Sequence, residues 1–165
     1  MELHIKAAQI TDAERLVQIQ IAAFHHDAVL YPDVGLGGPP GYDSVEQLRQ
    51  TIAQHPCYKL LYDDQVIGVM VIIVKGEQHT HLDLIAIDPH YHNRGLGTLA
   101  MQFLEQAHPA RCYTLDTPSW AVRNQHFYQK LGYVKVSATT YADITFRNDN
   151  AGAAAPYYEP FSLPA

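Results

Sequence analysis

The sequence has little positive charge and no cluster of it. Lys and Arg together number 11, against 17 Asp and Glu, and the formal net charge is −6. Binding to a nucleic-acid backbone or an anionic membrane requires a basic patch, so we expect neither as a partner. An acidic balance favours a cationic substrate such as an amine.

Long apolar runs and cysteines are also scarce. The longest apolar run, Val66 to Val74, is too short to span a membrane, and residues 1–4 lack the apolar core of a signal peptide. Cys57 and Cys112 lie in apolar, strand-like runs, whereas a secreted scaffold held by disulfides would carry more cysteines. These features predict a cytoplasmic protein with two buried thiols.

The length and the hydrophobic pattern predict one domain, residues 1–165, with a mixed sheet flanked by helices. Alternating apolar residues indicate strands, and apolar residues three or four apart indicate helices. In order, we expect a strand at 3–7, a helix capped by Thr11-Asp12 that ends near Phe24, a long loop at 25–43, a helix from Ser44 to about 54, strands at 57–62, 66–74 and 81–88, a helix at 96–107, a strand at 111–116, a helix from Ser119 to 131, and a terminal strand pair that begins at 133–141.

The passage before the helix at 96–107 has the composition of an anion site. It reads His92-Asn93-Arg94-Gly95-Leu96-Gly97-Thr98. Backbone N–H groups at a helix N-terminus lack intrahelical partners, and two glycines let a phosphate approach the main chain closely. Asn93 or Arg94 can add polar or charge-assisted contacts. A glycine turn that serves only helix–sheet packing is the alternative interpretation.

The same glycines fit a dinucleotide-binding fingerprint. Gly95-x-Gly97-x-x-Ala100 matches the pattern, and Asp116 lies near the spacing of a ribose-binding acid. In that motif the first glycine directly follows a strand, whereas here residues 89–94 intervene and the preceding strands read as antiparallel. We therefore favour a different phosphate ligand.

A second passage, Asn124 to Tyr133, places polar and aromatic side chains together. Asn124, Tyr128 and Leu131 share one face of the predicted helix at i, i+4 and i+7, and Trp120 joins that face. Aromatic residues at helical spacing usually pack in a core, so a packing role for Tyr128 is the alternative to a chemical one.

Together the two passages resemble the GCN5-related N-acetyltransferase (GNAT) superfamily. Its Q/R-x-x-G-x-G/A loop is similar to His92–Gly97, and its N-x-x-x-F-Y-x-x-L-G-F/Y signature is similar to Asn124–Tyr133. The order of elements agrees from Leu3 to about Tyr158. The resemblance implies a mixed, mostly antiparallel sheet of six to seven strands flanked by about four helices. One departure is His92, which stands where the family usually has Gln or Arg and brings less charge when neutral.

The resemblance implies an acyltransferase that moves the acetyl group of acetyl-CoA directly to a primary amine of an unidentified acceptor. Main-chain groups of residues 85–87 would pair with the pantetheine arm, the loop would bind the pyrophosphate, and Asn124 and Tyr128 would line the thioester end. The implied cofactor residues are Ile85, Ala86, Ile87, His92, Asn93, Arg94, Gly95, Leu96, Gly97, Thr98, Asn124 and Tyr128.

The implied chemistry needs an acid and a base. A phenol, with a pKa of about 10, can protonate a thiolate whose thiol has a pKa of about 8.5, so Tyr128 is the expected general acid. His81 falls where many relatives carry a catalytic Glu, and Asp83 shares its strand face. Either is a candidate base. The alternatives are a hydrogen-bonded structural role for each and a water chain in place of both.

Acceptor selection is expected from the long loop, which in the family's order borders the acceptor site. The candidate residues are His25, His26, Tyr31, Asp33 and Tyr42, and a solvated loop of turn residues is the alternative. The pairs His79/His81 and His90/His92 have the spacing of metal ligands, but no cysteine pair lies nearby and we expect no metal.

Two broader alternatives follow from the same residues. The nonstandard His92 and the unassigned base leave open a non-catalytic acyl-CoA-binding or sensing module. Tyr157, Tyr158 and Phe161 can pack on the chain's own sheet or on a second copy, so a homodimer is also open.

Overall fold

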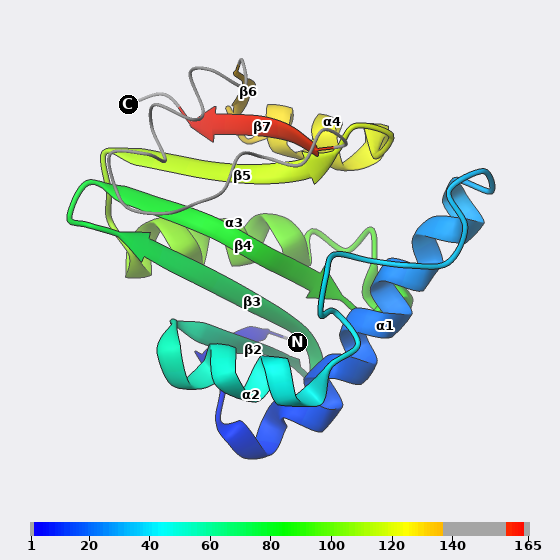
Figure 1. Ribbon diagram of the computed structural model, residues 1–165. Helices are drawn as coiled ribbons and strands as arrows, with labels where there is room; N and C mark the ends of the chain where they lie inside the picture. The colour runs from blue at the N-terminus through cyan, green and yellow to red at the C-terminus, as the bar shows by residue number, and fades with distance from the viewer. Residues whose placement is uncertain (1, 137–157, 164–165) are drawn as a thin grey trace. The chain divides into compact units, whose positions relative to one another are not determined.

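The computed structural model describes residues 2–136 and 158–163 (Figure 1). Within this part of the chain, seven strands form one sheet in the order β1-β2-β3-β4-β5-β7-β6, accompanied by four α-helices. This confirms the predicted mixed class. The elements are β1 (Leu3–Ala7), the short 3₁₀ helix η1 (Ile10–Asp12), α1 (Ala13–Leu30), α2 (Val45–Gln54), β2 (Cys57–Tyr62), β3 (Gln65–Lys75), β4 (His79–Ile87), the short 3₁₀ helix η2 (Pro89–Tyr91), α3 (Leu96–Ala107), β5 (Cys112–Pro118), α4 (Val122–Lys130), β6 (Val134–Lys135) and β7 (Tyr158–Leu163).

The chain forms two compact units that alternate along the sequence. Unit 1 comprises Met1–Ile72 and Leu84–Gln106, and unit 2 comprises Ile73–Asp83 and Ala107–Ala165. Strands β3 and β4 each begin in one unit and end in the other. Each unit therefore takes part of its structure from the β3–β4 hairpin.

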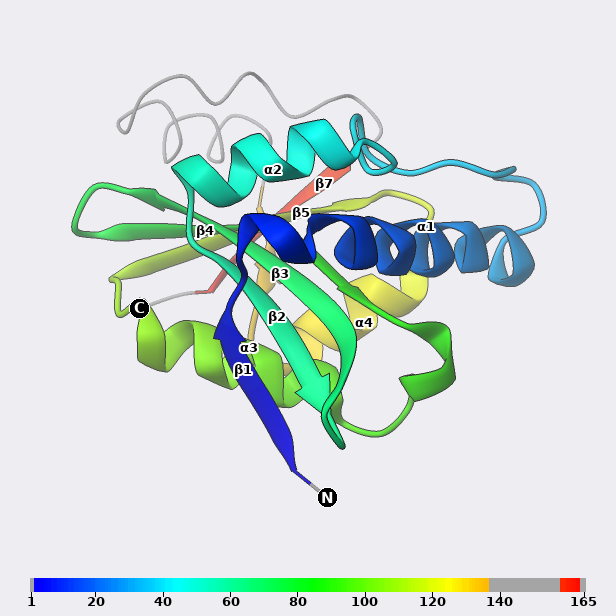
Figure 2. The same ribbon diagram turned by 90° about the horizontal axis from the view of Figure 1, so that it is seen from below.

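In unit 1 the helices lie on both faces of the strands. Helices α1 and α2 cover one face of β1 and β2, and α3 covers the other (Figure 2). Successive residues of a strand point to opposite faces, so Cys57 of β2 lies in the core under α1 and α2, while the ring of Tyr58 packs edge-on against Phe103 of α3 at 4.9 Å. The buried cluster under α1 and α2 consists of Ala13, Leu16, Val17, Ile19, Leu48, Cys57, Val69, Val71 and Ala86.

The β2–β3 hairpin forms as predicted. Asp63 and Asp64 make its two-residue turn with positive φ angles of 49° and 61°, the backbone that matches the twist of a tight hairpin. Farther along β3, a Cβ atom at Gly68 would lie 3.0 Å from the carbonyl oxygen of Ala86. Gly68 therefore permits the close approach of these two backbones.

Helix α1 is longer than the sequence predicts. We expected it to end near Phe24, with His25 and His26 in the loop, but it continues to Leu30. Residues 25–30 contain neither Gly nor Pro, so nothing in them stops the helix before Pro32. The expected cap of α2 is confirmed, because Ser44 Oγ accepts a hydrogen bond from the N–H of Gln47 at 3.1 Å.

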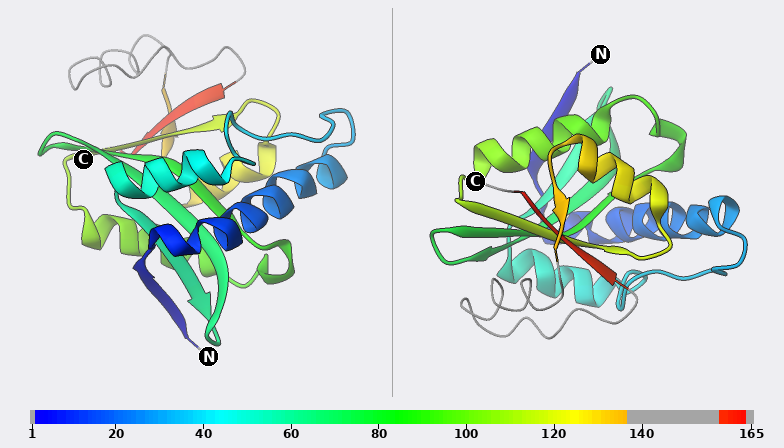
Figure 3. Two further views of the ribbon diagram at one scale, coloured as in Figure 1. Left: turned by 60° about the horizontal axis from the view of Figure 1, so that its bottom comes forward. Right: turned by 90° about the horizontal axis from the view of Figure 1, so that it is seen from above.

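Unit 2 is organised around β5 (Figure 3). The parallel register with β4 runs from His79↔Cys112 to Leu82↔Leu115, and β7 pairs antiparallel with β5 and with β6. Phe161 of β7 is fully buried opposite Leu115. The other two aromatic residues named for packing, Tyr157 and the side chain of Tyr158, lie outside the described residues.

Helix α4 begins later than predicted. Ser119 does not cap it: the cap position is Ala121, and Ser119 lies in a turn where its carbonyl oxygen accepts from Gln125 Nε2 at 3.0 Å. Gly132, at φ 94°, ends the helix as expected. Of the strand expected at 133–141, Val134–Lys135 is present as β6, and residues 137–141 lie outside the described part.

Candidate active site

The loop between β4 and α3 combines two left-handed backbone positions with a buried helix start. Asn93 and Gly95 have φ angles of 61° and 74°, and Leu96 then anchors the first turn of α3 in the core. Among the described residues, and leaving aside Gly95 and its two chain neighbours, no heavy atom lies within 4 Å of the position a Cβ would take at Gly95. The first-turn N–H groups, which have no intrahelical partner, thus border space that a phosphate can enter. Gly97 and the half-buried Thr98 belong to this turn.

His92 uses one ring nitrogen on its own backbone. Its Nε2 lies 2.8 Å from the carbonyl oxygen of Ile87, and since a carbonyl only accepts, Nε2 carries the hydrogen. The ring also contacts His26 of α1 edge-on at 5.6 Å. Any phosphate contact by His92 therefore has to use Nδ1. The sequence could not show this, because the partner is a main-chain atom.

The predicted pantetheine residues form the last part of β4. The printed parallel register with β5 ends at Leu82, and β4 continues for five more residues to Ile87. Ala86 is buried in the core, whereas Ile85 and Ile87, which alternate with it, are half-buried. A ligand would meet Ala86 only through its main chain.

A surface hollow of about 640 Å³ lies beside η2. Asp88 accepts from the N–H and from Nδ1 of His90, at 3.0 and 2.9 Å, and Arg15 lies 4.0 Å away. Burial raises the pKa of Asp88, but the His90 contacts and the Arg15 charge outweigh it and leave the pKa lowered. Arg94 stacks over the Tyr91 ring at 5.2 Å. The lining residues are Arg15, Tyr62, Asp63, Gln65, Ile67, Asp88, His90, Tyr91 and Arg94.

Two of the expected acceptor residues meet across α1 and the loop. His25 Nε2 lies 2.8 Å from the hydroxyl of Tyr42, and the Tyr42 ring also packs edge-on against Phe24. Buried Gln20 donates through Nε2 to the carbonyl oxygen of Tyr42 at 2.7 Å. Tyr42 therefore fastens the end of the long loop to α1. At its other end, Tyr31 terminates α1 and Asp33 is exposed.

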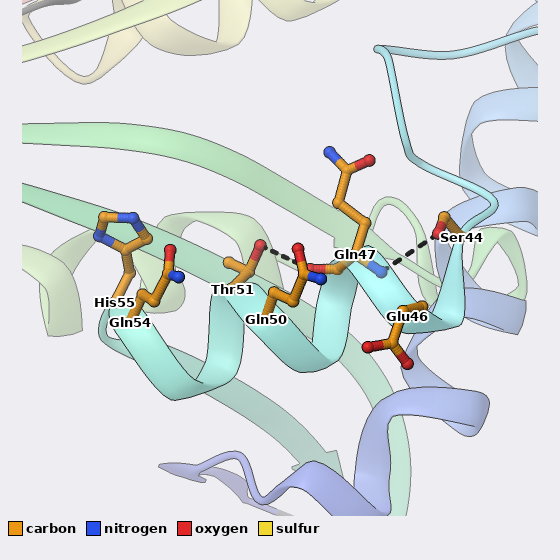
Figure 4. A pocket seen from close by; sticks show the side chains of 7 residues that line it. All are labelled: Ser44, Glu46, Gln47, Gln50, Thr51, Gln54 and His55. Carbon is orange, nitrogen blue, oxygen red and sulfur yellow. Dashed lines mark hydrogen bonds between the residues drawn. The ribbon is translucent and has the colours of Figure 1, made fainter.

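Helix α2 carries a second surface hollow that the sequence did not indicate. Its volume is about 450 Å³, and three amide side chains line it (Figure 4). Thr51 Oγ1 donates to the carbonyl oxygen of Gln47 at 3.0 Å. The lining residues are Ser44, Glu46, Gln47, Gln50, Thr51, Gln54 and His55. Uncharged amides spaced along a helix face suit hydrogen bonding to a polar ligand.

The base candidates occupy unit 2. His81 Nδ1 lies 2.8 Å from Thr114 Oγ1, and its Nε2 lies 3.9 Å from Asp116 Oδ2. Burial, and then the Lys75 charge, lower the pKa of His81 to about 3. Asp83, the other candidate, is exposed. Burial also lowers the pKa of Lys75, against the opposing charges of Asp116 and Asp83.

The acid candidate is buried in α4. Tyr128 is 7% exposed, and its ring centroid lies 5.1 Å from that of Phe127 and 6.0 Å from that of Tyr133. Burial raises the pKa of Tyr128, so the phenol stays protonated at neutral pH. Asn124, one turn earlier, is exposed. The packing contacts and the protonated hydroxyl are compatible with both interpretations of Tyr128.

No three His, Cys, Asp or Glu side chains in the described residues gather as metal ligands do. Over the same residues, none of the helices has the length and apolar character needed to cross a membrane.

Comparison with known proteins identifies one family and one fold. The model of the acetyltransferase (GNAT) family matches residues 22–133. The PaiA N-acetyltransferase of Thermoplasma acidophilum, solved with coenzyme A, superposes with a TM-score of 0.75 at 14% identity over 100% of both chains. The ribosomal-protein-S18-alanine N-acetyltransferase of Escherichia coli superposes with a TM-score of 0.68 at 15% identity, over 99% of this chain and 94% of that chain.

A curated relative matches part of the sequence. The uncharacterized protein YrkN of Bacillus subtilis (strain 168) is 32% identical over 79 residues, which are 46% of this chain and 43% of YrkN. The chain thus aligns with less than half the length of that relative.

Proposed function

Because the chain belongs to the acetyltransferase (GNAT) family, we propose that it transfers the acetyl group of acetyl-CoA directly to a primary amine. The observation that carries the proposal is the loop at residues 92–98, where Gly95 borders open space at the start of α3. A helix N-terminus with a glycine at this position suits a pyrophosphate. The coenzyme A bound to the Thermoplasma protein supports the same ligand class.

Cofactor binding in this proposal relies mainly on backbone. Main-chain groups of Ile85 and Ile87 hold the pantetheine arm, and the first turn of α3 holds the pyrophosphate. His92 is a positioning residue here, because its Nε2–H holds the Ile87 carbonyl. Arg94, stacked on Tyr91, contributes positive charge beside the loop.

In the chemical step, each unit 2 side chain has one task. Tyr128 supplies the proton to the departing thiolate, which its protonated, buried phenol can do. His81 receives the proton of the amine, because its lowered pKa keeps the ring unprotonated at neutral pH. Asp116 and Asp83 attract the cationic acceptor before it loses that proton.

The acceptor is proposed as an amine on a small molecule or a peptide. The Escherichia coli relative is named for transfer to an alanine of a ribosomal protein, which belongs to this class. Loop residues held by Tyr42, together with the amide-lined hollow on α2, are the proposed selecting groups. A single domain over 1–165, a cytoplasmic location and a homodimer stay predictions.

The decisive experiment replaces Tyr128 with Phe and follows thiol release from acetyl-CoA with a panel of amines. Loss of the phenol should lower kcat about a hundredfold while the KM for acetyl-CoA stays within about twofold. Tyr133→Phe is the matched control, because Tyr133 is also a buried tyrosine beside the same helix. An unchanged kcat in Tyr128→Phe removes this residue from the mechanism.

A second candidate function is a non-catalytic acyl-CoA sensor, because a pKa of about 3 leaves the His81 ring neutral but also makes it a weak base for an amine. Thiol release with any amine excludes it. Both functions require acetyl-CoA to bind with its pyrophosphate at the first turn of α3. Gly97→Glu tests this requirement, because a carboxylate there repels the phosphates and should abolish acetyl-CoA binding. A dinucleotide-binding enzyme is tested by the shift in melting temperature. NADH should raise the melting temperature of such an enzyme, whereas acetyl-CoA should raise that of a transferase or a sensor.

A further inference from the structure

Two buried imidazoles in unit 2 share one hydroxyl group. Thr114 Oγ1 lies 2.5 Å from His79 Nε2 and 2.8 Å from His81 Nδ1. The β4–β5 register places His81 directly opposite Thr114, and His79, two residues earlier, points to the same face. The two rings are 2% and 6% exposed. This contact is not part of the predicted site, in which His79 has no role.

The protonated nitrogen of one ring depends on that of the other, because both rings share the Thr114 hydroxyl. Both rings are neutral at pH 7, because burial lowers the pKa of His79 to about 4 and that of His81 to about 3. A neutral imidazole has one N–H and one bare nitrogen, and a hydroxyl has one hydrogen to donate. The Thr114 hydroxyl can therefore donate to only one of the two rings. The other ring must present an N–H to it.

We propose that Thr114 is a positioning residue that joins His79 and His81 into a proton relay. Nδ1–H of His81 donates to Thr114 Oγ1, and the Thr114 hydroxyl donates to Nε2 of His79. This arrangement makes Nε2 of His81 the nitrogen that receives the proton. The inference rests on the proposed function, in which His81 deprotonates the acceptor amine.

The transfer balances in three coupled moves. The amine nitrogen loses one hydrogen to Nε2 of His81. The Nδ1–H bond of His81 breaks as a new O–H bond forms at Thr114, and the original O–H bond of Thr114 breaks as an N–H bond forms at Nε2 of His79. His81 ends neutral in its other tautomer, Thr114 ends neutral, and the positive charge rests on His79.

The groups around His81 explain why this ring alone would be a poor base. Lys75 on β3 and the neighbouring His79 disfavour a positive charge on His81, in addition to its burial. Burial and the Lys75 charge lower the pKa of His79 as well, to about 4, so the relay moves the proton between two rings of similar basicity and away from the reacting amine. Asp116 Oδ2, at 3.9 Å from Nε2, is beyond hydrogen-bond length, but its negative charge favours a cationic amine near this nitrogen.

The first test is spectroscopic and needs no activity. Ring ¹⁵N resonances of the wild-type protein at neutral pH report which nitrogens carry hydrogen. We expect His81 to be protonated at Nδ1 and His79 to be bare at Nε2, and we expect Thr114→Val to change the tautomer populations of both rings while Thr114→Ser preserves them. Hydrogen on both nitrogens that face Thr114 would overturn the relay.

The second test is kinetic, on the full chain with acetyl-CoA and an amine acceptor. Thr114→Val should lower kcat about tenfold or more with the KM for acetyl-CoA within about twofold, and Thr114→Ser should restore most of the loss. The matched control is Thr117→Val, because Thr117 is a buried threonine of the same strand whose hydroxyl has no hydrogen-bond partner among the described residues. A full rate in Thr114→Val overturns the relay while the proposed function stands.

The two proposals fail differently. Absence of thiol release by the wild type with every amine contradicts the proposed function. The ¹⁵N measurement still decides whether Thr114 couples the two rings, since it depends only on the folded protein.

Discussion

Among single residues, Gly95 combines a strained backbone with empty surroundings. Its φ of 74° disfavours any side chain, yet apart from its chain neighbours no described residue comes within 4 Å of the Cβ position. We predict that Gly95→Ala lowers the free energy of unfolding by about 1 kcal/mol and weakens acetyl-CoA binding, because the loop backbone relaxes. Urea denaturation and calorimetry measure the two effects.

Gly37 provides the control for Gly95. It also has open space at the Cβ position but does not have a positive φ. Gly37→Ala should leave stability and acetyl-CoA affinity nearly unchanged. Equal effects of the two substitutions would show that backbone conformation at Gly95 has no special part in the loop.

The two cysteines differ more than the sequence predicts. Both were expected to be buried, but only Cys57 is, and burial together with the charge of Asp12 raises the pKa of its thiol to about 12. We predict that a thiol reagent at pH 8 labels half-buried Cys112 in the folded protein and reaches Cys57 only after unfolding, since the thiolate is the reactive form. Mass spectrometry of single-cysteine variants measures this, and equal labelling rates would contradict it.

Among the elements, the β2–β3 turn contains residues that are not the most favourable for its backbone conformation. Asp63 and Asp64 both adopt positive φ, which Asn and Gly tolerate better than Asp. The double substitution Asp63→Asn with Asp64→Gly should raise the free energy of unfolding by about 0.5–1 kcal/mol in urea denaturation. The control double substitution, Asp63→Ala with Asp64→Ala, should lower the free energy of unfolding, because alanine disfavours a positive φ. Stabilisation by the alanine pair would contradict the assigned turn.

Elements with a strong local signal could be predicted, and their ends less well. The β2–β3 hairpin, the Ser44 cap and the span of α3 depend on residues close together in the sequence, and the structure confirms all three. The predicted end of α1 is wrong because residues 25 and 26 lie next to a loop rich in Gly and Pro, although both histidines are compatible with a helix. Ser119 was wrong as a cap because the Pro118–Ala121 turn precedes the helix, and the sequence allows either start.

The parts of the site that consist of residues close together in the sequence could be predicted. The glycine loop and the Asn124–Tyr133 passage each lie within ten or so residues, so their motifs identify the family. The contact between His81 and Thr114 depends on the register of β4 with β5, which no local pattern records. The roles of His81, Asp83 and Tyr128 stay predictions.

For the whole molecule, the buried histidines predict a loss of stability on acidification. The pKa values of His79 and His81 in the folded protein, about 4 and about 3, lie below the ordinary value of about 6.5 that the unfolded chain has. Above pH 6.5 neither state gains a proton at these rings. As the pH falls from about 6.5 towards 3, the unfolded chain binds protons first, and stability declines by about 3 kcal/mol through His79 and about 5 kcal/mol through His81.

Urea denaturation at pH 7, 6, 5 and 4 measures this decline. The double variant His79→Gln with His81→Gln removes both groups, so its stability should depend less steeply on pH over the same range. A wild-type free energy of unfolding that stays constant from pH 7 to 4 would contradict the buried, neutral state of the rings.

The alternation of the two units along the chain constrains how this protein can evolve. A recombination that joins two related genes after Gln106 would take residues 73–83 of unit 2 from one parent and residues 107–165 from the other. His79 and His81 would then come from one ancestor and Thr114 from the other. Any single junction between residues 81 and 114 separates the two imidazoles from the hydroxyl in this way, whereas a junction before residue 79 or after residue 114 takes all three from one parent.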